Sequence, residues 1–351
     1  MWMLCGARVL AASAGFDFSS VTATVQGWVD NGYYPGAAVL IAKDNQVIYQ
    51  RCFGRYTPGT EVFIASAGKW LAAATILSLV DDQKLSLDET AAKWLPEFKN
   101  DPKGEATLRQ MLSHTSGYPA YQPQDKPVDK YQTLSESVEH LLPLPPASKP
   151  GQRFEYGGLA MQVAGRMAEV ATGRDWETLF QERIARPCRM TNTHFVPVDA
   201  GGGHSPMLGG AARSNLHDYA NFLSMIANTG KFEGKRVLSE RAIREMQADQ
   251  VRAALVKAPE FPERVRGNKH QGIYGLGEWR EELDGEGNAT LISSPSWAGT
   301  YPWIDKRVGV YGVIMAHVEE SRANLEKFSG FYSSPVLAQM TREIIAAASK
   351  Q

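Results

Sequence analysis

One apolar segment, Ser66–Val80, constrains the fold more than any other part of the sequence. Its apolar residues cover nearly the whole circumference of a helix: Trp70, Leu71, Ala74, Ile76, Leu77 and Leu79. A helix that is apolar on nearly every side is stable only when other elements surround it, so we predict a buried helix here. A chain of 351 residues is long enough to bury one, since at this length roughly three quarters of the unfolded surface becomes buried.

Strand patterns occur near both ends of the chain, and helical patterns fill the middle. The strand candidates are Ala37–Ile41, Gln46–Cys52, Gly272–Trp279, Asn288–Ser293 and Val308–His317. The turn formers Asp44 and Asn45 join the first two into a predicted β-hairpin. We therefore predict an α+β fold, in which an antiparallel sheet is flanked by helices and carries an inserted, mostly helical domain. The predicted bounds are 15–80 and 266–351 for the α/β domain and 81–265 for the helical domain.

Composition and charge argue against several functional classes. Lys and Arg number 37 and Asp and Glu 38, so the net charge of −1 supplies no field that attracts nucleic acid or anionic lipid. The sequence has no apolar run of 18 residues, so we expect no membrane span. Three cysteines without a C-x-x-C pair, and seven scattered histidines, match no disulfide framework and no metal motif. We expect neither a metal nor an organic cofactor.

The first 14 residues are ambiguous. They are mostly apolar and end in Ala12-Ser13-Ala14, which resembles a signal-peptide cleavage site. No charge precedes Arg8, however, and Gly6 interrupts the apolar stretch. An ordinary N-terminal segment is therefore favoured over a signal remnant, and a cytoplasmic location slightly over a periplasmic or secreted one.

Ser66-Ala67-Gly68-Lys69 is an S-x-x-K motif at the start of the apolar helix. Residues i and i+3 share a helix face, so the Ser66 hydroxyl and the Lys69 amine can meet. A serine becomes a good nucleophile only when a base takes its proton, and burial lowers the pKa of a lysine toward that role. The competing interpretation is a helix-capping serine beside a solvated lysine.

Four segments occur in a characteristic order: Val62–Leu71, Leu85–Glu89, Trp94–Phe98 and Leu108–Gly117. Together they resemble the penicillin-recognising serine hydrolases. The W-x-G triplet Trp297-Ala298-Gly299 makes the resemblance closest to the family VIII carboxylesterases of that superfamily. It implies a β-lactamase/DD-peptidase-like fold, with an active site in the cleft between the sheet domain and the helical domain.

The resemblance also implies that Tyr156 is the second catalytic element. The segment Pro150–Gly158 matches the context of the family's Y-x-N motif, but Gly158 stands where the family has asparagine. That asparagine helps to hold the substrate amide in the lactamases, so its loss argues against efficient β-lactam turnover. A literal Y-x-N at Tyr219 lies within a predicted helix, where we expect a packing residue.

The third family element is a K-T-G or H-x-G triplet, and Trp297-Ala298-Gly299 occupies its place. Trp297 cannot neutralise a substrate carboxylate, but it offers an apolar wall and one N–H donor. By analogy, the backbone N–H groups of Ser66 and Thr300 form the oxyanion hole. Trp297, Ala298, Gly299, Gly158 and Tyr118 are the predicted substrate-binding residues.

These features favour a serine carboxylesterase that acts on short to medium acyl chains through an acyl-enzyme on Ser66. Lys69, alone or with Tyr156, takes the serine proton, and Tyr156 protonates the leaving alcohol. The alternatives are a β-lactamase or D-amino-acid peptidase or amidase, an acyltransferase with the same residues, and a non-catalytic binding protein. The expected partner is a small-molecule ester or β-lactam-like substrate. The oligomeric state is not predicted.

Overall fold

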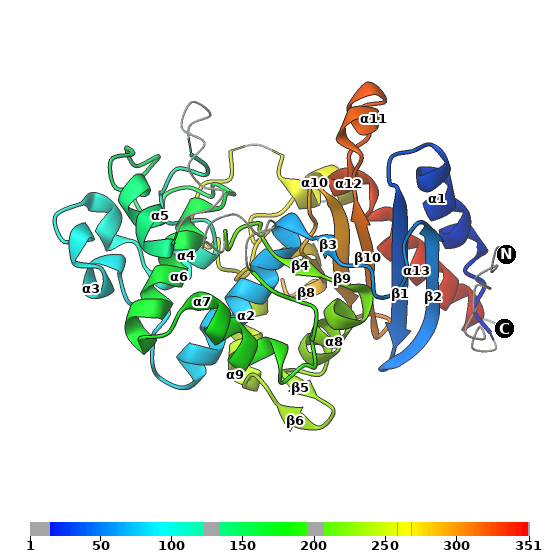
Figure 1. Cartoon of the computed structure of the whole chain (residues 1–351), viewed down its shortest axis with the longest axis horizontal. Coiled ribbons are helices and arrows are strands. Elements are labelled where there is room, and N and C mark those ends of the chain that lie inside the picture. The colour runs from blue at the N-terminus through cyan, green and yellow to red at the C-terminus, as the bar shows by residue number, and fades with distance from the viewer. Residues whose placement is uncertain (1–14, 123–132, 196–206, 258, 268, 350–351) are drawn as a thin grey trace, which may run out of the picture.

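The computed structural model describes residues 15–122, 133–195, 207–257, 259–267 and 269–349 (Figure 1). Its main sheet has the strand order β2-β1-β10-β9-β8-β7, and every neighbouring pair is antiparallel. These strands are β1 Gly36–Lys43, β2 Gln46–Gly54, β7 Trp279–Leu283, β8 Ala289–Ser293, β9 Gly299–Asp305 and β10 Val310–His317. Strands from the two ends of the chain meet where β1 pairs with β10. The predicted antiparallel α+β fold is confirmed.

Helices cover both faces of this sheet (Figure 1). The terminal helices α1 Ser19–Asp30 and α13 Val336–Ala348 pack on each other and on one face. Helix α8, Leu216–Ala227, packs on the other face against β1, β9 and β10. Alternate residues of β1 therefore belong to different apolar clusters, with Val39 on the side of the terminal helices and Leu40 on the side of α8.

Short helices make up most of the region between β2 and β7. The α-helices are α2 Gly68–Asp81, α3 Ala91–Trp94, α4 Leu108–Leu112, α5 Leu134–Leu141, α6 Leu159–Thr172, α7 Trp176–Phe180, α9 Glu240–Gln247 and α10 Phe261–Arg266. A π-helical turn, Gln181–Ala185, follows α7. Three 3-10 turns, Ala65–Ala67, Pro96–Phe98 and Pro102–Glu105, and the short strands β3 Val62–Phe63, β4 Arg213–Ser214, β5 Lys231–Phe232 and β6 Lys235–Arg236 complete this region. After β10 come α11 Glu320–Leu325 and α12 Gly330–Ser333. The predicted domain bounds stay a prediction.

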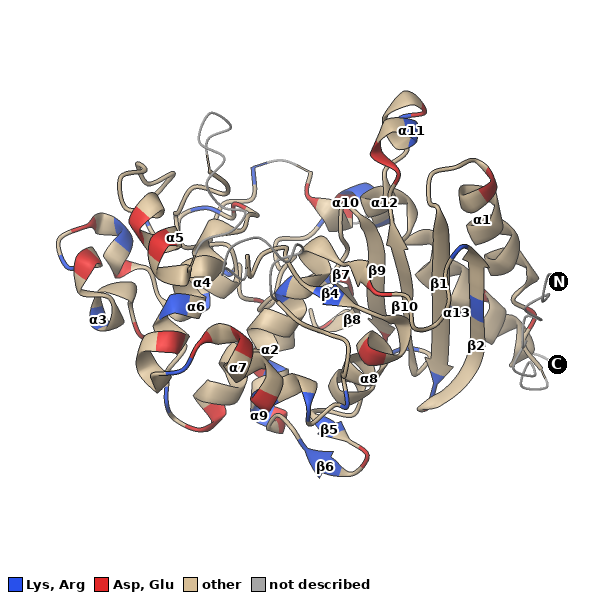
Figure 2. Ribbon diagram, viewed as in Figure 1, with Lys and Arg blue, Asp and Glu red and all other residues tan. Residues whose placement is uncertain are grey.

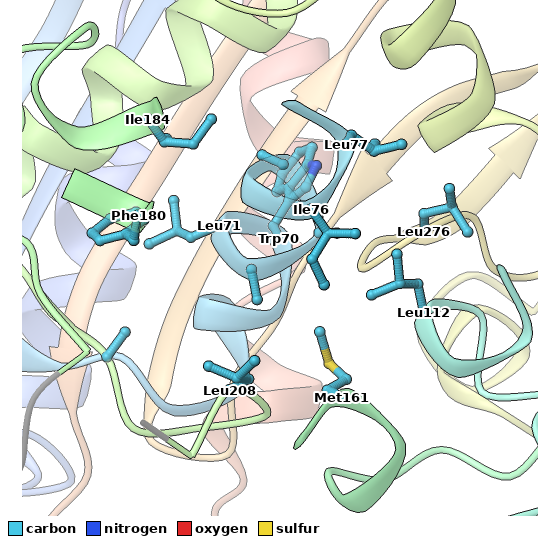
Figure 3. Packing of buried hydrophobic residues seen from close by; sticks show 14 of the residues in the cluster. Trp70, Leu71, Ile76, Leu77, Leu112, Met161, Phe180, Ile184, Leu208 and Leu276 are labelled. Carbon is cyan, nitrogen blue, oxygen red and sulfur yellow. The ribbon is translucent and has the colours of Figure 1, made fainter. Parts of the chain in front are cut away.

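Helix α2 is the buried helix that the sequence predicts. Every residue from Gly68 to Leu79 is buried. Side chains from several elements surround it in Figure 3, among them Leu112, Met161, Phe180, Ile184, Leu208 and Leu276. The apolar residues of α2 are thus distributed around the helix because every side of it contacts protein.

One strand prediction was wrong in its bounds, and one strand was missed. Gly272–Trp279 was predicted as a strand, but β7 begins only at Trp279. The glycines let this segment lie against α2: Gly277 has φ +78°, and a Cβ there would come within 2.6 Å of the Lys69 carbonyl oxygen. Strand β9 was not predicted, because all seven of its residues are buried and it contains Pro302, so it shows no alternation.

No helix among the described residues is long and apolar enough to cross a membrane. The ambiguous residues 1–14 lie outside the described part of the chain.

Candidate active site

The predicted Ser66–Lys69 pair forms at the start of α2. Ser66 lies in the 3-10 turn Ala65–Ala67, one residue before the helix begins. Ala65 adopts φ +43°, a left-handed conformation that costs energy for a residue with a Cβ. Lys69 Nζ lies 3.0 Å from Ser66 Oγ, which is hydrogen-bonding distance. The i, i+3 spacing therefore produces the contact expected from it.

Burial makes the protonated amine of Lys69 a stronger acid than an exposed lysine, so that it gives up its proton more readily. Its side chain is 1% exposed. Nζ also donates a hydrogen bond to the Gly209 carbonyl oxygen, and Lys69 forms no ion pair with a carboxylate in the described part of the chain. Desolvation lowers the pKa of Lys69 from 10.5 to about 7. A large fraction of Lys69 is therefore neutral near pH 7 and able to accept a proton from Ser66.

Tyr156 completes this group of side chains. Lys69 Nζ lies 4.7 Å from the centroid of its ring. Burial raises the pKa of Tyr156, the charge of Tyr121 raises it further, and hydrogen-bonding interactions with Ser66 and Trp279 oppose the rise. The phenol is accordingly neutral near pH 7 and can donate its proton. Tyr156 thus lies within hydrogen-bonding reach of Ser66, with which it was predicted to exchange a proton.

His114, for which the sequence predicts no role, packs against the ring of Tyr156. The rings of His114 and Tyr156 are 4.7 Å apart, and His114 Nε2 lies 3.2 Å from the Tyr274 hydroxyl. Burial and, to a smaller extent, the charge of Lys69 lower the pKa of His114 well below its usual value. The histidine is therefore neutral. Only its place in the segment Leu108–Gly117, which carries part of the family resemblance, could have drawn attention to it.

The turn that contains His114 also holds the segment that carries Tyr156. The backbone N–H of Glu155 donates to the His114 carbonyl oxygen at 2.8 Å. The N–H of Gly151 donates to the Thr115 carbonyl oxygen at 2.7 Å. Two backbone hydrogen bonds thus fix the position of the tyrosine relative to the end of α4.

Tyr219 has the packing position expected of it. It is buried in α8, and its hydroxyl donates to the Ala67 carbonyl oxygen at 2.7 Å. This hydrogen bond supports the turn that contains Ser66 from the side of the sheet. No local sequence pattern could indicate this hydrogen bond, because the two residues are 152 positions apart.

Gly158 leaves open space in the site. A Cβ built at Gly158 would have no neighbour closer than 3.9 Å, and its φ of −113° suits any residue. At Gly157, in contrast, a Cβ would lie 2.2 Å from the Ala120 carbonyl oxygen. Glycine is therefore required by packing at 157 but not at 158.

The segment Trp297–Thr300 lies at the start of β9, which packs beside the 3-10 turn of Ser66. Trp297 is 47% exposed and contacts the rings of Phe63 and His317 at 6.2 and 5.9 Å. Ala298 and Thr300 are buried. Gly299 has φ +108°, and a Cβ there would lie 2.6 Å from the Tyr34 ring, so packing requires glycine.

Tyr118 does not lie with these residues at a surface that a substrate could contact. It is 2% exposed, stacks on Phe98 and donates its hydroxyl to the Lys103 carbonyl oxygen at 2.7 Å. The structure therefore gives Tyr118 a packing position in place of the substrate contact that the sequence suggested.

No group of His, Cys, Asp and Glu side chains in the described ranges is arranged to hold a metal ion. The reactive groups of the site are the Ser66 hydroxyl, the Lys69 amine with its lowered pKa, and the Tyr156 phenol. This set suits acyl transfer through a covalent serine intermediate.

Residues 21–327 match the beta-lactamase family, which is most of the chain. The chain belongs to the beta-lactamase family. It is therefore a member of the β-lactamase-like serine hydrolase superfamily, as the resemblance implied. The structure of a candidate β-lactamase from Bacteroides dorei DSM 17855 is 49% identical, with a TM-score of 0.90 over 94% of this chain and 99% of that one.

Other members of the superfamily are more distant. EstCE1, a hydrolase with promiscuous acyltransferase activity, is 20% identical with a TM-score of 0.68, over 84% of this chain and 92% of that one. A candidate D-alanyl-D-alanine carboxypeptidase from Escherichia coli K12 is 33% identical over 48% of this chain and 45% of its own length. The protein flp of Staphylococcus aureus NCTC 8325 is 27% identical over 48% of this chain and 36% of its own length. The chain thus spans less than half the length of these two curated relatives.

Proposed function

We propose that this β-lactamase family member is a serine carboxylesterase that acts on short to medium acyl chains. Lys69 takes the proton of Ser66, whose Oγ attacks the ester carbonyl carbon. The N–H groups of Ser66 and Thr300 stabilise the oxyanion. Tyr156 gives a proton to the leaving alcohol and takes one in return from the ammonium of Lys69, which lies against its ring. Water then hydrolyses the acyl-enzyme, and its proton leaves through the same groups, which restores the Ser66 hydroxyl. The observation that carries this proposal is the contact of Ser66 Oγ with a buried lysine whose pKa is about 7.

Two positions favour an ester over a β-lactam as the substrate. Gly158 has no side chain that could hold a substrate amide, although the space for one exists. Trp297 places an exposed indole where the family resemblance has a lysine or histidine, so this position supplies no positive charge for a carboxylate. A neutral acyl or alcohol group fits such a surface better.

The second candidate is β-lactam or D-amino-acid amide hydrolysis. It is favoured by the 49% identity to the candidate β-lactamase, which far exceeds the identity to EstCE1. The same residues could also transfer the acyl group to an alcohol in place of water, as the description of EstCE1 illustrates for a protein of this fold.

A paired assay tests the proposal. The wild-type protein, Ser66→Ala and the control Ser20→Ala, which changes an exposed serine of α1, are purified identically. Each is given p-nitrophenyl butyrate and nitrocefin. We expect ester cleavage that is lost by several orders of magnitude in Ser66→Ala alone, with little nitrocefin turnover.

Other outcomes of the assay are equally informative. Ester cleavage that survives in Ser66→Ala would refute the assigned nucleophile. Fast nitrocefin turnover would move the second candidate to first place. Labelling by a fluorophosphonate probe identifies a reactive serine independently of the substrate, and its absence would favour a non-catalytic binding protein.

A further inference from the structure

A cavity of about 420 Å³ adjoins Trp297 on the side of α11. Its walls come from the segment after β10, from α11 and from the start of α12, which lie together beside the sheet in Figure 1. The lining includes Trp297, Glu320, Asn324, Phe328, Ser329 and Gly330. The volume is in the range of small-molecule sites, and it suits one substituent of a substrate rather than a large ligand.

Glu320 is the one charged residue of the lining. Figure 2 shows acidic residues on α11, the element that carries Glu320. The nearest cation on this helix is already engaged, because Arg322 pairs with Glu326 at 3.1 Å and donates Nε to the Asn31 carbonyl oxygen. Within the described ranges Glu320 forms no ion pair, so its charge is not neutralised.

Trp297 connects this cavity with the catalytic serine. Trp297 lines the cavity, and its ring centroid lies 6.2 Å from that of Phe63, three residues before Ser66. The strand that follows Trp297, β9, packs on the 3-10 turn that contains Ser66. To occupy this cavity, a substrate held at Ser66 has to extend past Trp297. The face of an indole attracts a cation, and a carboxylate nearby adds to that attraction.

We propose that this cavity binds a positively charged ammonium group of the substrate. The preferred substrates are then esters that carry a primary or quaternary amine, with the ester carbonyl at Ser66 and the cation between Trp297 and Glu320. This inference rests on the proposed function and narrows its substrate class. Because Glu320 is exposed, the expected preference is modest, about tenfold.

Matched substrates isolate the charge. Butyrylthiocholine and 3,3-dimethylbutyl thiobutyrate differ in the leaving group only by a quaternary nitrogen in place of carbon. The p-nitrophenyl esters of 4-(trimethylammonio)butanoic acid and 5,5-dimethylhexanoic acid make the same comparison in the acyl group. We expect kcat/KM to favour the cation by about tenfold in one of the two pairs at low ionic strength, and the ratio to fall as salt is added.

Variants identify the residues responsible. Glu320→Gln should bring the ratio close to one, and Trp297→Leu should reduce it. Glu326→Gln is the control, because it removes a carboxylate from the same stretch of chain that is not part of the cavity lining. Ratios near one in both pairs with active wild-type protein would overturn the proposal, as would a preference that Glu320→Gln leaves intact.

A binding measurement separates this inference from the proposed function. If no ester is cleaved, the Ser66→Ala protein is titrated with choline and with 3,3-dimethylbutanol, and tryptophan fluorescence is followed. Saturable binding of choline alone, lost in Ser66→Ala/Glu320→Gln, would support the cation site while the esterase proposal fails. Equal responses to the two compounds, or no response, would refute the cation site.

Discussion

The free energy of unfolding should depend on pH differently in the wild-type protein and in Lys69→Met, because burial lowers the pKa of Lys69. Lys69 is protonated in the unfolded chain up to about pH 10.5, but in the folded protein only up to about pH 7. Between these values the unfolded state binds more protons, so the folded protein gains stability as pH rises. Lys69→Met lacks this dependence.

The size of the effect follows from the two pKa values. At pH 7 the unfavourable burial of Lys69 lowers the free energy of unfolding by about 4 kcal/mol, and at pH 10 by about 1 kcal/mol. The wild-type protein should therefore gain about 3 kcal/mol relative to Lys69→Met over this interval. Urea unfolding of both proteins at several pH values measures the difference directly, with Lys84→Met as a control for exchanging an exposed lysine.

Two results would contradict this reasoning. One is a stability difference that stays constant from pH 7 to pH 10. The other concerns the rate: since only neutral Lys69 can accept the Ser66 proton, kcat/KM for ester hydrolysis should rise with pH and level off above about pH 7. A rate that continues to rise toward pH 10 would show that Lys69 keeps an ordinary pKa.

Three further changes test the site and its surroundings. Tyr156→Phe removes the proton donor but keeps the ring, so kcat should fall by about 100-fold or more while circular dichroism stays unchanged; an unaltered kcat would exclude the proton-transfer role. Gly158→Asn fills open space, so the protein should fold normally and gain nitrocefin turnover relative to ester turnover; an unchanged ratio would show that this position does not set the substrate class. Glu278→Gln replaces a fully buried carboxyl whose pKa is raised by burial, while the charges of Lys306 and Arg280 and the indole of Trp70 oppose the rise. The folded protein therefore holds this proton to higher pH than the unfolded chain, so the wild-type protein should lose stability relative to Glu278→Gln as pH rises above about 4.5. A difference in melting temperature between the two proteins that is the same at pH 5 and at pH 8 would contradict the raised pKa.

The sequence predicts those parts of the site that depend on local geometry. The contact between Ser66 and Lys69 follows from residues three apart at the start of a helix, and the burial of Lys69 follows from the apolar residues around it. Tyr156 was located only through the family resemblance, since nothing in its neighbourhood fixes its distance from a lysine 87 positions earlier.

Features that depend on tertiary packing were missed or misjudged. His114 and Tyr274 are 160 positions apart, so no local pattern could pair them. Tyr118 was expected to be one of several aromatic residues that line the cleft, but its ring is buried and stacks on Phe98. Strand β9 is buried on both faces, and such a strand lacks the alternation by which exposed strands are recognised.

The burial of α2 on all sides has a consequence for how this protein loses activity. A helix packed against α6, α7, α9 and the turn Gln181–Ala185 cannot detach without breaking the apolar cluster that these elements share, so its amide hydrogens should exchange only through global unfolding. The reactive serine and its base lie at the start of that helix. Mild denaturant should therefore unfold the peripheral helices while Ser66 and Lys69 keep their geometry. Loss of activity should coincide with the cooperative unfolding of the whole protein.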